Sequence, residues 1–215
     1  MKKLVIFDMD GVLLDSEKLY LDMNRKFFKE LGAEISREEH LTFVGISATT
    51  MWKYIREKFD LPQTVDELKE MEKELKYEML KKENLIPSKH IITYLQFLKE
   101  NGNTLAIASS GLRKNIDLIL SKLGMEVYFD LIVSGEQVTK GKPEPDIFQM
   151  VSRHFGRAPG ECIVIEDSKN GVLAAKAAQM FCIGYRNPTS GNQDLSPADI
   201  IIDHFQDSRL FQLVT

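Results

Sequence analysis

The feature that most restricts the fold of this chain is a series of short apolar segments separated by longer amphipathic ones. The apolar segments occupy residues 4–7, 104–109, 131–135, 162–166, 181–185 and 199–202. Short apolar runs that alternate with helical patterns are typical of parallel strands covered by helices on both faces. We therefore predict an α/β fold with a Rossmann-like parallel sheet as its core.

Residues 16–86 interrupt this alternation with a long stretch of helical pattern. The apolar spacing predicts three helices there, the second over roughly 47–59 and the third opened by a capping box at Thr64. We interpret the stretch as a small α-helical domain inserted after the first strand. The core is then formed by residues 1–15 and 87–215.

Composition and charge exclude several classes of protein. Apolar residues make up 43% of the chain, enough for a core, and the net charge of −4 gives no general attraction to nucleic acid or to an anionic membrane. The sequence has no apolar run of about 18 residues, and its N-terminus lacks the apolar region of a signal peptide. We expect a cytoplasmic monomer with a small-molecule substrate, whose two cysteines are buried free thiols.

Polar residues stand at the ends of the first four predicted strands. In strand order they are Asp8 and Asp10, then Ser109 and Ser110, then Lys142, then Glu166 and Asp167. Ligands of open α/β sheets bind beyond the carboxyl ends of the strands, so we expect these side chains to converge on one rim.

Several carboxylates at one rim need a positive partner. Two carboxylates 4 Å apart repel each other by about 4 kcal/mol at an effective dielectric constant of 20, so a group of them stays ionised only beside a cation. Oxygen ligands without nearby His or Cys favour Mg²⁺. The serine hydroxyls and Lys142 are donors that suit a bound phosphate.

The spacing of Asp8 and Asp10 also suits a two-step reaction. One carboxylate can attack phosphorus and form an aspartyl-phosphate. The other can protonate the leaving oxygen and then activate water, because two acids in different environments can hold different roles. We predict Asp8 as the nucleophile and Asp10 as the acid and base.

These segments resemble the four motifs of the haloacid dehalogenase superfamily. DMDGV resembles the first motif, AIASS the second, GKPEPDIF the third and VIEDSKNGV the fourth. The resemblance covers essentially the whole chain, and the helical insert is placed like the α-helical cap of one large branch.

The resemblance implies a Rossmann-like core, bound Mg²⁺ and roles for individual residues. Asp8, Asp10 and Asp167 are implied as metal ligands, Asp10 through its backbone carbonyl, with Glu166 in support. Ser109, Ser110 and Lys142 are implied as phosphate-binding residues.

Within this superfamily the sequence favours a phosphatase of small phosphate monoesters, such as sugar phosphates, over a β-phosphoglucomutase. The mutases carry a His where this chain has Tyr20, and an Arg just after a cap loop that resembles VGIS here. The corresponding positions after Gly45 are Ala48 and Thr49, neither of which is basic. The mutase stays the alternative. A non-catalytic binding protein would not need the full set of acids and Lys142.

The roles of some residues stay open at this point. Asp15 and Ser16 either cap the first inserted helix, which we favour, or form a hinge. Tyr20, Thr49 and Trp52 either line a substrate pocket or, as we favour for each, have no such role, since a lone Trp on a helix usually packs in a core or interface. Ser168 either orients the acids or begins the next helix. Gln179 stands at a left-handed position where relatives usually have Gly, at a cost of about 1 kcal/mol.

Overall fold

The protein is described by a computed structural model that covers residues 2–41, 43 and 47–214. This part of the chain divides into two compact units. The first consists of Met1–Asp15 and Leu85–Thr215, and the second of Ser16–Asn84. None of the helices within the described residues is long and apolar enough to cross a membrane.

The first unit is built on a parallel sheet, as predicted. The strands found in the described residues are β1 (Leu4–Phe7), β2 (Thr104–Ser109), β3 (Leu131–Ser134), β4 (Cys162–Glu166), β5 (Phe181–Tyr185) and β6 (Ile200–Ile202). Their order in the sheet is β3-β2-β1-β4-β5-β6. The chain therefore builds the sheet outward from β1, first to one side and then to the other, as in doubly wound folds.

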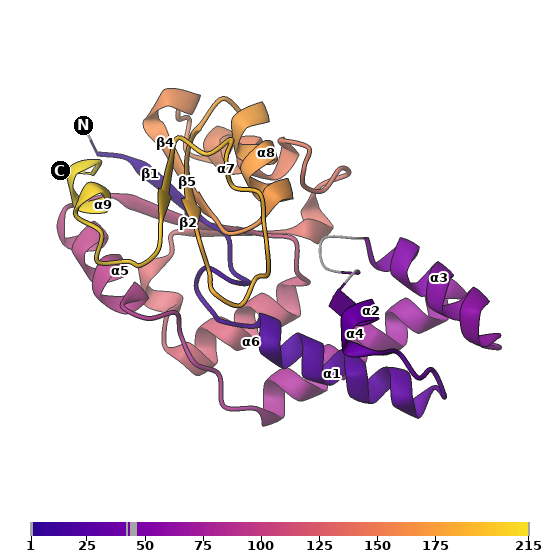
Figure 1. The fold of residues 1–215 in the computed structure, drawn as a ribbon. Helices are drawn as coiled ribbons and strands as arrows, with labels where there is room; N and C mark the ends of the chain where they lie inside the picture. Colours follow the sequence, from indigo (N-terminus) through magenta and orange to yellow (C-terminus); the bar gives the residue numbers. More distant parts are fainter. Residues whose placement is uncertain (1, 42, 44–46, 215) are drawn as a thin grey trace. The chain divides into compact units, whose positions relative to one another are not determined.

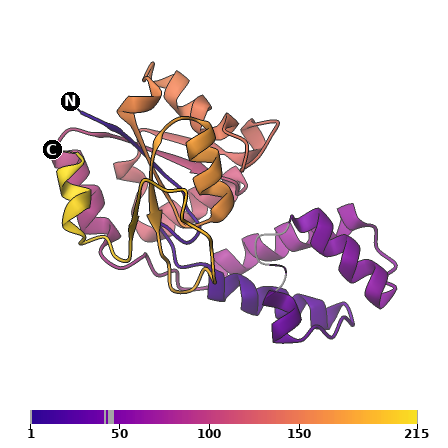
Figure 2. The same ribbon diagram turned by 45° about the horizontal axis from the view of Figure 1, so that its top comes forward.

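Helices cover both faces of this sheet (Figure 1). They are α5 (Ile91–Glu100), α6 (Arg113–Leu123), α7 (Asp146–His154), α8 (Lys169–Ala177) and α9 (Ser208–Gln212). Short 3-10 turns lie at Glu126–Tyr128, Gly135–Gln137 and Pro159–Glu161. Figure 2 shows α9 beside α5, where the rings of Phe97 and Phe211 meet at 4.7 Å between centroids.

Alternate residues of the strands fill two apolar layers. Leu4 and Ile6 of β1 belong to a buried cluster that includes Phe148 of α7 and Val172 of α8. Phe7 points to the opposite face, where its ring contacts Tyr94 of α5. Because a strand buried on both faces cannot alternate apolar with polar residues, LVIF reads as a continuous apolar run.

The second unit consists of helices. They are α1 (Glu17–Glu30), α2 (Arg37–Leu41), α3 (Ala48–Phe59) and α4 (Val65–Lys82). The capping box expected at Thr64 is present, with Thr64 and Glu67 exchanging side-chain and backbone hydrogen bonds. The short helix α2 was not predicted, because five residues carry too little periodicity to reveal a helix.

Trp52 lies in the core of the second unit. It is fully buried, with its ring edge-to-face against Phe27 and Phe28, and its Nε1 donates to Glu72 Oε2 at 2.6 Å. Packing was therefore the correct interpretation for Trp52, and a substrate-lining role is excluded by its burial. Thr49, by contrast, is exposed on α3.

The expectation that Asp15 and Ser16 cap the first helix is wrong. Ser16 occupies the N-cap position of α1 in a right-handed helical conformation, and its buried Oγ has no hydrogen-bond partner among the described residues. An N-cap side chain normally reaches the helix from an extended conformation, which Ser16 lacks. Asp15 instead accepts a hydrogen bond from the hydroxyl of Thr189.

Gln179 adopts the left-handed conformation expected from the sequence, with φ of 59°. We predict that Gln179→Gly raises the free energy of unfolding by about 0.5–1 kcal/mol, since glycine relieves the strain but adds freedom to the unfolded chain. Ala178→Gly is the matched control, because Ala178 has φ of −76° and gains no such relief. Denaturant unfolding measures both. Equal destabilisation by the two substitutions would contradict the prediction.

His40 gives the second unit a dependence on pH. It is buried, its ring lies 5.1 Å from that of Phe28, and burial lowers its pKa. Below about pH 6.5 the unfolded chain binds a proton that the folded chain does not, so stability should fall as the pH drops. Urea unfolding followed by the fluorescence of Trp52 should show this loss in the wild type and a smaller one in His40→Phe. The same loss in both would refute the assignment to His40.

Candidate active site

The acidic residues meet at the point where the order of the strands reverses. Asp8 directly follows β1, and Glu166 and Asp167 end and follow β4. The two strands are neighbours, with Phe7 paired to Ile165, and the amide of Asp8 continues the ladder by donating to the Ile165 carbonyl at 3.0 Å. A crevice at such a switch point is where doubly wound sheets bind ligands.

Lys142 joins the ends of three strands. Its ammonium donates to Asp8 Oδ1 and Glu166 Oε1, both at 2.5 Å, and to the backbone carbonyl of Ala108 in β2 at 2.9 Å. An ammonium has three protons, so these contacts match its full donor capacity. The side chain is only 6% exposed, and a buried charge of this kind is tolerated because it is paired on all sides.

The ammonium contacts two members of a group of three buried carboxylates. Asp8, Glu166 and Asp167 each offer an oxygen, and these oxygens lie within 4.8 Å of one another. One lysine cannot neutralise three carboxylates, and a hard divalent cation bound by the remaining oxygens would complete the balance. The cluster therefore has the composition of a divalent-metal site.

The pKa values of Asp8 and Lys142 are shifted by burial and by the charges beside them. Burial raises the pKa of Asp8 to about 7, against the effect of Lys142 and with added repulsion from Glu166. For Lys142, burial works to lower the pKa, but the carboxylates of Asp8 and Glu166 outweigh it and hold the pKa above its ordinary value. A bound cation would favour the ionised form of Asp8, which is the form that can act as a nucleophile.

Ser168 both contacts one of the acids and begins the next helix, which are the two roles that the sequence left open. Its hydroxyl donates to Glu166 Oε2 at 3.0 Å and accepts the amide of Gly171 at 3.0 Å as the N-cap of α8. Glu166 lies so close to the first turn of α8 that a Cβ on Gly171 would stand 1.8 Å from its carboxyl carbon. Glu166 is thus fixed by Lys142 on one side and by the start of α8 on the other.

Asp10 lies in the tight turn that follows β1. The amide of Gly11 donates to the carbonyl of Leu14 at 2.7 Å, and Gly11 has φ of +82°. The acidic cluster found among the described residues does not include the Asp10 side chain. A contribution of Asp10 through its backbone carbonyl stays a prediction.

The predicted phosphate-binding serines lie at the carboxyl end of β2, the neighbour of β1, where Ser109 is the last residue of the strand and Ser110 follows it. Ser109 is buried, and its Oγ accepts the amide of Gly111 at 3.1 Å, whereas Ser110 is exposed. The chain is tightly packed here, because a Cβ on Gly135 would stand 2.6 Å from the Ser110 carbonyl oxygen. The second motif is thus held at the same edge of the sheet as Asp8.

Sequence reasoning missed the residues of the loop that follows β5. Asn187 Nδ2 donates to the carbonyl of Gly11 at 3.0 Å, and the hydroxyl of Ser190 donates to Asp167 Oδ2. The rule that placed the other groups, which is to inspect the residues beyond each strand, would have found them had it been applied to the fifth strand.

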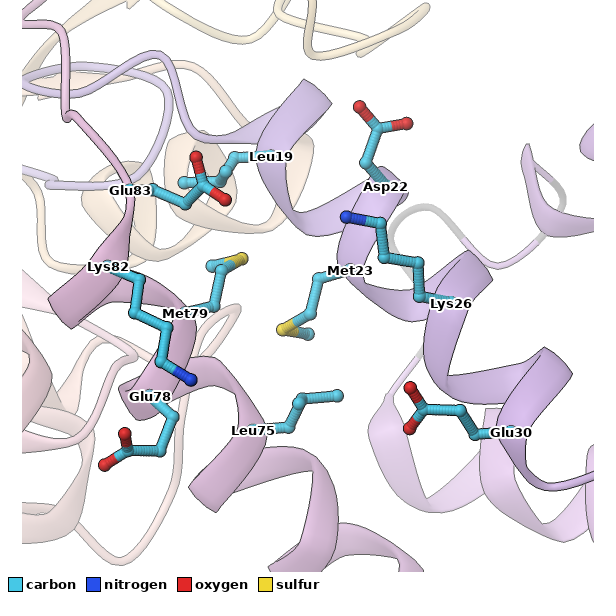
Figure 3. Close-up of a pocket in the computed structure, with 10 residues that line it drawn as sticks. All are labelled: Leu19, Asp22, Met23, Lys26, Glu30, Leu75, Glu78, Met79, Lys82 and Glu83. Carbon is cyan, nitrogen blue, oxygen red and sulfur yellow. The ribbon is translucent and has the colours of Figure 1, made fainter.

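A pocket of about 300 Å³ lies within the helical unit, between α1 and α4 (Figure 3). Leu19, Met23, Leu75 and Met79 form its apolar part. The charged residues around it are Asp22, Lys26, Glu30, Glu78, Lys82 and Glu83. None of these ten residues belongs to the four motifs or to the acidic cluster.

The sheet order, the acidic cluster and the buried lysine define a Rossmann-like protein with a candidate divalent-metal site at the carboxyl edge of its sheet. Residues 5–185 match the family of haloacid dehalogenase-like hydrolases, and the chain belongs to this family. The resemblance to the haloacid dehalogenase superfamily is confirmed, as is the prediction that the chain is an enzyme of this hydrolase family.

The chain is also similar to individual proteins of known name and structure. A phosphorylated carbohydrates phosphatase of Thermotoga maritima is 34% identical over 177 residues, which cover 81% of this chain and 80% of that protein. A beta-phosphoglucomutase of Bacillus subtilis is 30% identical over 220 residues, covering 97% and 92%. The structure of CbbY from Rhodobacter sphaeroides in complex with phosphate has a TM-score of 0.82 at 24% identity over 96% of each chain, a likeness that shows the fold.

Substitution of Gly11 tests whether the backbone of the first motif must lie close to the Asp167 side chain of the fourth. A Cβ at this position would stand 1.9 Å from Asp167 Oδ2, and φ of +82° disfavours any side chain. We expect Gly11→Ala to lower the free energy of unfolding by about 1–3 kcal/mol. Gly160→Ala is the control, because nothing lies within 4 Å of a Cβ there. Equal stability of the two variants in denaturant would show that the approach is not required.

Proposed function

We propose that this enzyme is a Mg²⁺-dependent phosphatase that hydrolyses small phosphate monoesters, such as sugar phosphates, through an aspartyl-phosphate on Asp8. The observation that carries the proposal is the buried trio of Asp8, Glu166 and Asp167 at the switch point of the sheet, with Lys142 bound to the first two. Family membership and the relative named as a phosphatase of phosphorylated carbohydrates support the substrate class.

The first step transfers the phosphoryl group to the protein. A carboxylate oxygen of Asp8 attacks phosphorus while the bond from phosphorus to the ester oxygen breaks. Asp10, in its protonated form, gives its proton to the departing alkoxide, which leaves as an alcohol. Ser109, Ser110 and Lys142 are proposed to hold the phosphoryl oxygens in line for this attack.

The second step returns the enzyme to its starting state. Asp10, now a carboxylate, takes a proton from a water molecule, and the water oxygen attacks phosphorus. The bond between phosphorus and Asp8 then breaks, which releases inorganic phosphate and restores both acids. Mg²⁺, held by Asp8, Asp167 and the backbone carbonyl of Asp10, would supply positive charge to balance the phosphoryl group.

We assign residues 1–15 and 87–215 to the catalytic core and residues 16–86 to a cap domain that sets substrate choice. The two compact units of the structure meet between Asp15 and Ser16 and again between Asn84 and Leu85. These boundaries support a division into a core and an inserted cap. Side chains on helices, rather than the shared motifs, would then distinguish one phosphate monoester from another.

A mutase is the second candidate, and it is favoured by the similarity to the beta-phosphoglucomutase of Bacillus subtilis. Tyr20, which replaces the His of the mutases, lies on α1 with the ammonium of Lys76 3.6 Å from the centre of its ring. Ala48 and Thr49 provide no cation, and Gly45 of the preceding loop lies outside the described residues. Incubation with β-glucose 1-phosphate and a bisphosphate primer separates the two functions, since a mutase yields glucose 6-phosphate and a phosphatase yields inorganic phosphate.

The phosphatase is tested by measuring phosphate release from a panel of sugar phosphates and related metabolites. We expect turnover with Mg²⁺, loss of turnover with EDTA, and a decrease on the order of 10³-fold or more in Asp8→Asn, which lacks the nucleophile. Asp117→Asn, which changes an exposed carboxylate on α6, should retain the wild-type rate. The proposal would be refuted if neither the wild type nor Asp8→Asn released phosphate from any compound of the panel.

A further inference from the structure

The loop between β5 and β6 packs against the candidate active site without belonging to any of the four motifs. It runs over residues 186–199, and two of its polar side chains, Asn187 and Ser190, are at least 95% buried. A buried polar group costs free energy unless it is hydrogen-bonded, so the partners of these two residues indicate what the loop does.

Ser190 contacts one of the acids directly. Its hydroxyl donates to Oδ2 of Asp167, and the same oxygen lies where a Cβ on Gly11 would be only 1.9 Å away. The Asp167 carboxylate is therefore confined by the Gly11 backbone and by the Ser190 hydroxyl. A carboxylate held in this way keeps one orientation.

Asn187 contacts the turn that contains Asp10. Its Nδ2 donates to the carbonyl of Gly11 at 3.0 Å, while its Oδ1 accepts the amide of Thr189, also at 3.0 Å. These contacts fix the orientation of the side-chain amide, because the nitrogen must face Gly11 and the oxygen must face Thr189. Asn187 thus holds the peptide between Gly11 and Val12, one residue beyond Asp10.

The loop is itself braced from two directions. The hydroxyl of Thr189 donates to the carboxylate of Asp15, near the end of the first motif. The side chain of Gln193 accepts the amide of Lys169, at the start of α8, and donates to the carbonyl of Ser190. Hydrogen bonds therefore connect the loop to the segments that follow β1 and β4.

We propose that Ser190 and Asn187 are positioning residues for the divalent cation. They orient the Asp167 carboxylate and the Asp10–Gly11 turn, and so keep two segments of the metal site at the correct separation. The proposal rests on the Mg²⁺ dependence of the proposed function. Groups that orient metal ligands typically contribute 10–100-fold to metal affinity.

The test is the affinity for Mg²⁺ alone, measured by calorimetry on the metal-free full-length protein and by the rise in melting temperature with added Mg²⁺. We expect Ser190→Ala to weaken Mg²⁺ binding about 10–100-fold, and Asn187→Ala to weaken it in the same direction. Ser196→Ala is the matched control, since the Ser196 hydroxyl also donates to a carboxylate of this loop, Asp194, at 2.7 Å but away from the cluster. It should bind Mg²⁺ within about twofold of wild type.

The possible outcomes distinguish a role of Ser190 and Asn187 in positioning the metal site from a role in the stability of the fold alone. A structural role alone would lower the melting temperature equally with and without Mg²⁺, leave the dissociation constant unchanged and overturn the proposal. Wild-type protein that binds no Mg²⁺ would overturn the metal requirement of the proposed function and the positioning role together. Tight Mg²⁺ binding by wild type and by Ser190→Ala alike would overturn the positioning role only, because the metal requirement would still stand.

Discussion

The contact on which the site depends is that of one buried ammonium with two carboxylates and a backbone carbonyl. Lys142 allows Asp8 and Glu166 to lie side by side at the ends of neighbouring strands, where each would otherwise be repelled by the other and poorly hydrated. Its third contact, to Ala108, ties the pair to β2. Through these hydrogen bonds the Lys142 side chain connects the ends of β1, β2 and β4.

Neighbouring residues hold the carboxylates of this cluster in place. Glu166 lies against the start of α8, where Ser168 donates to it and Gly171 leaves room for it. Asp167 lies against Gly11 on the opposite segment. Small residues are required at both glycine positions because a carboxylate occupies the volume that a side chain would take. The three acids together exceed the single charge that Lys142 can balance, which is the physical reason to expect a cation.

Much of this was predictable from the sequence, and the failures have physical causes. The strands were found because buried parallel strands are continuous apolar runs, and the motif residues were found because they follow those runs. Ser16 was misjudged since its type suits a cap but its backbone conformation does not. Asn187 and Ser190 were missed because a polar loop residue looks the same in a sequence whether it contacts solvent or a buried carboxylate. The contacts of Lys142 with both Asp8 and Glu166 depend on the strand order, which no local pattern contains.

The position of β1 in the sheet has a consequence for the growing polypeptide. This strand is synthesised before the other strands of the sheet but lies between β2 and β4, so its partners emerge from the ribosome only much later. Until then LVIF is an unpaired apolar segment with a tendency to aggregate. Lys2 and Lys3 precede it and Asp8 and Asp10 follow it, so charges flank it on both sides in the manner of gatekeeper residues. The acids for which we propose a chemical role in the finished enzyme are thereby also placed to limit aggregation of the nascent chain.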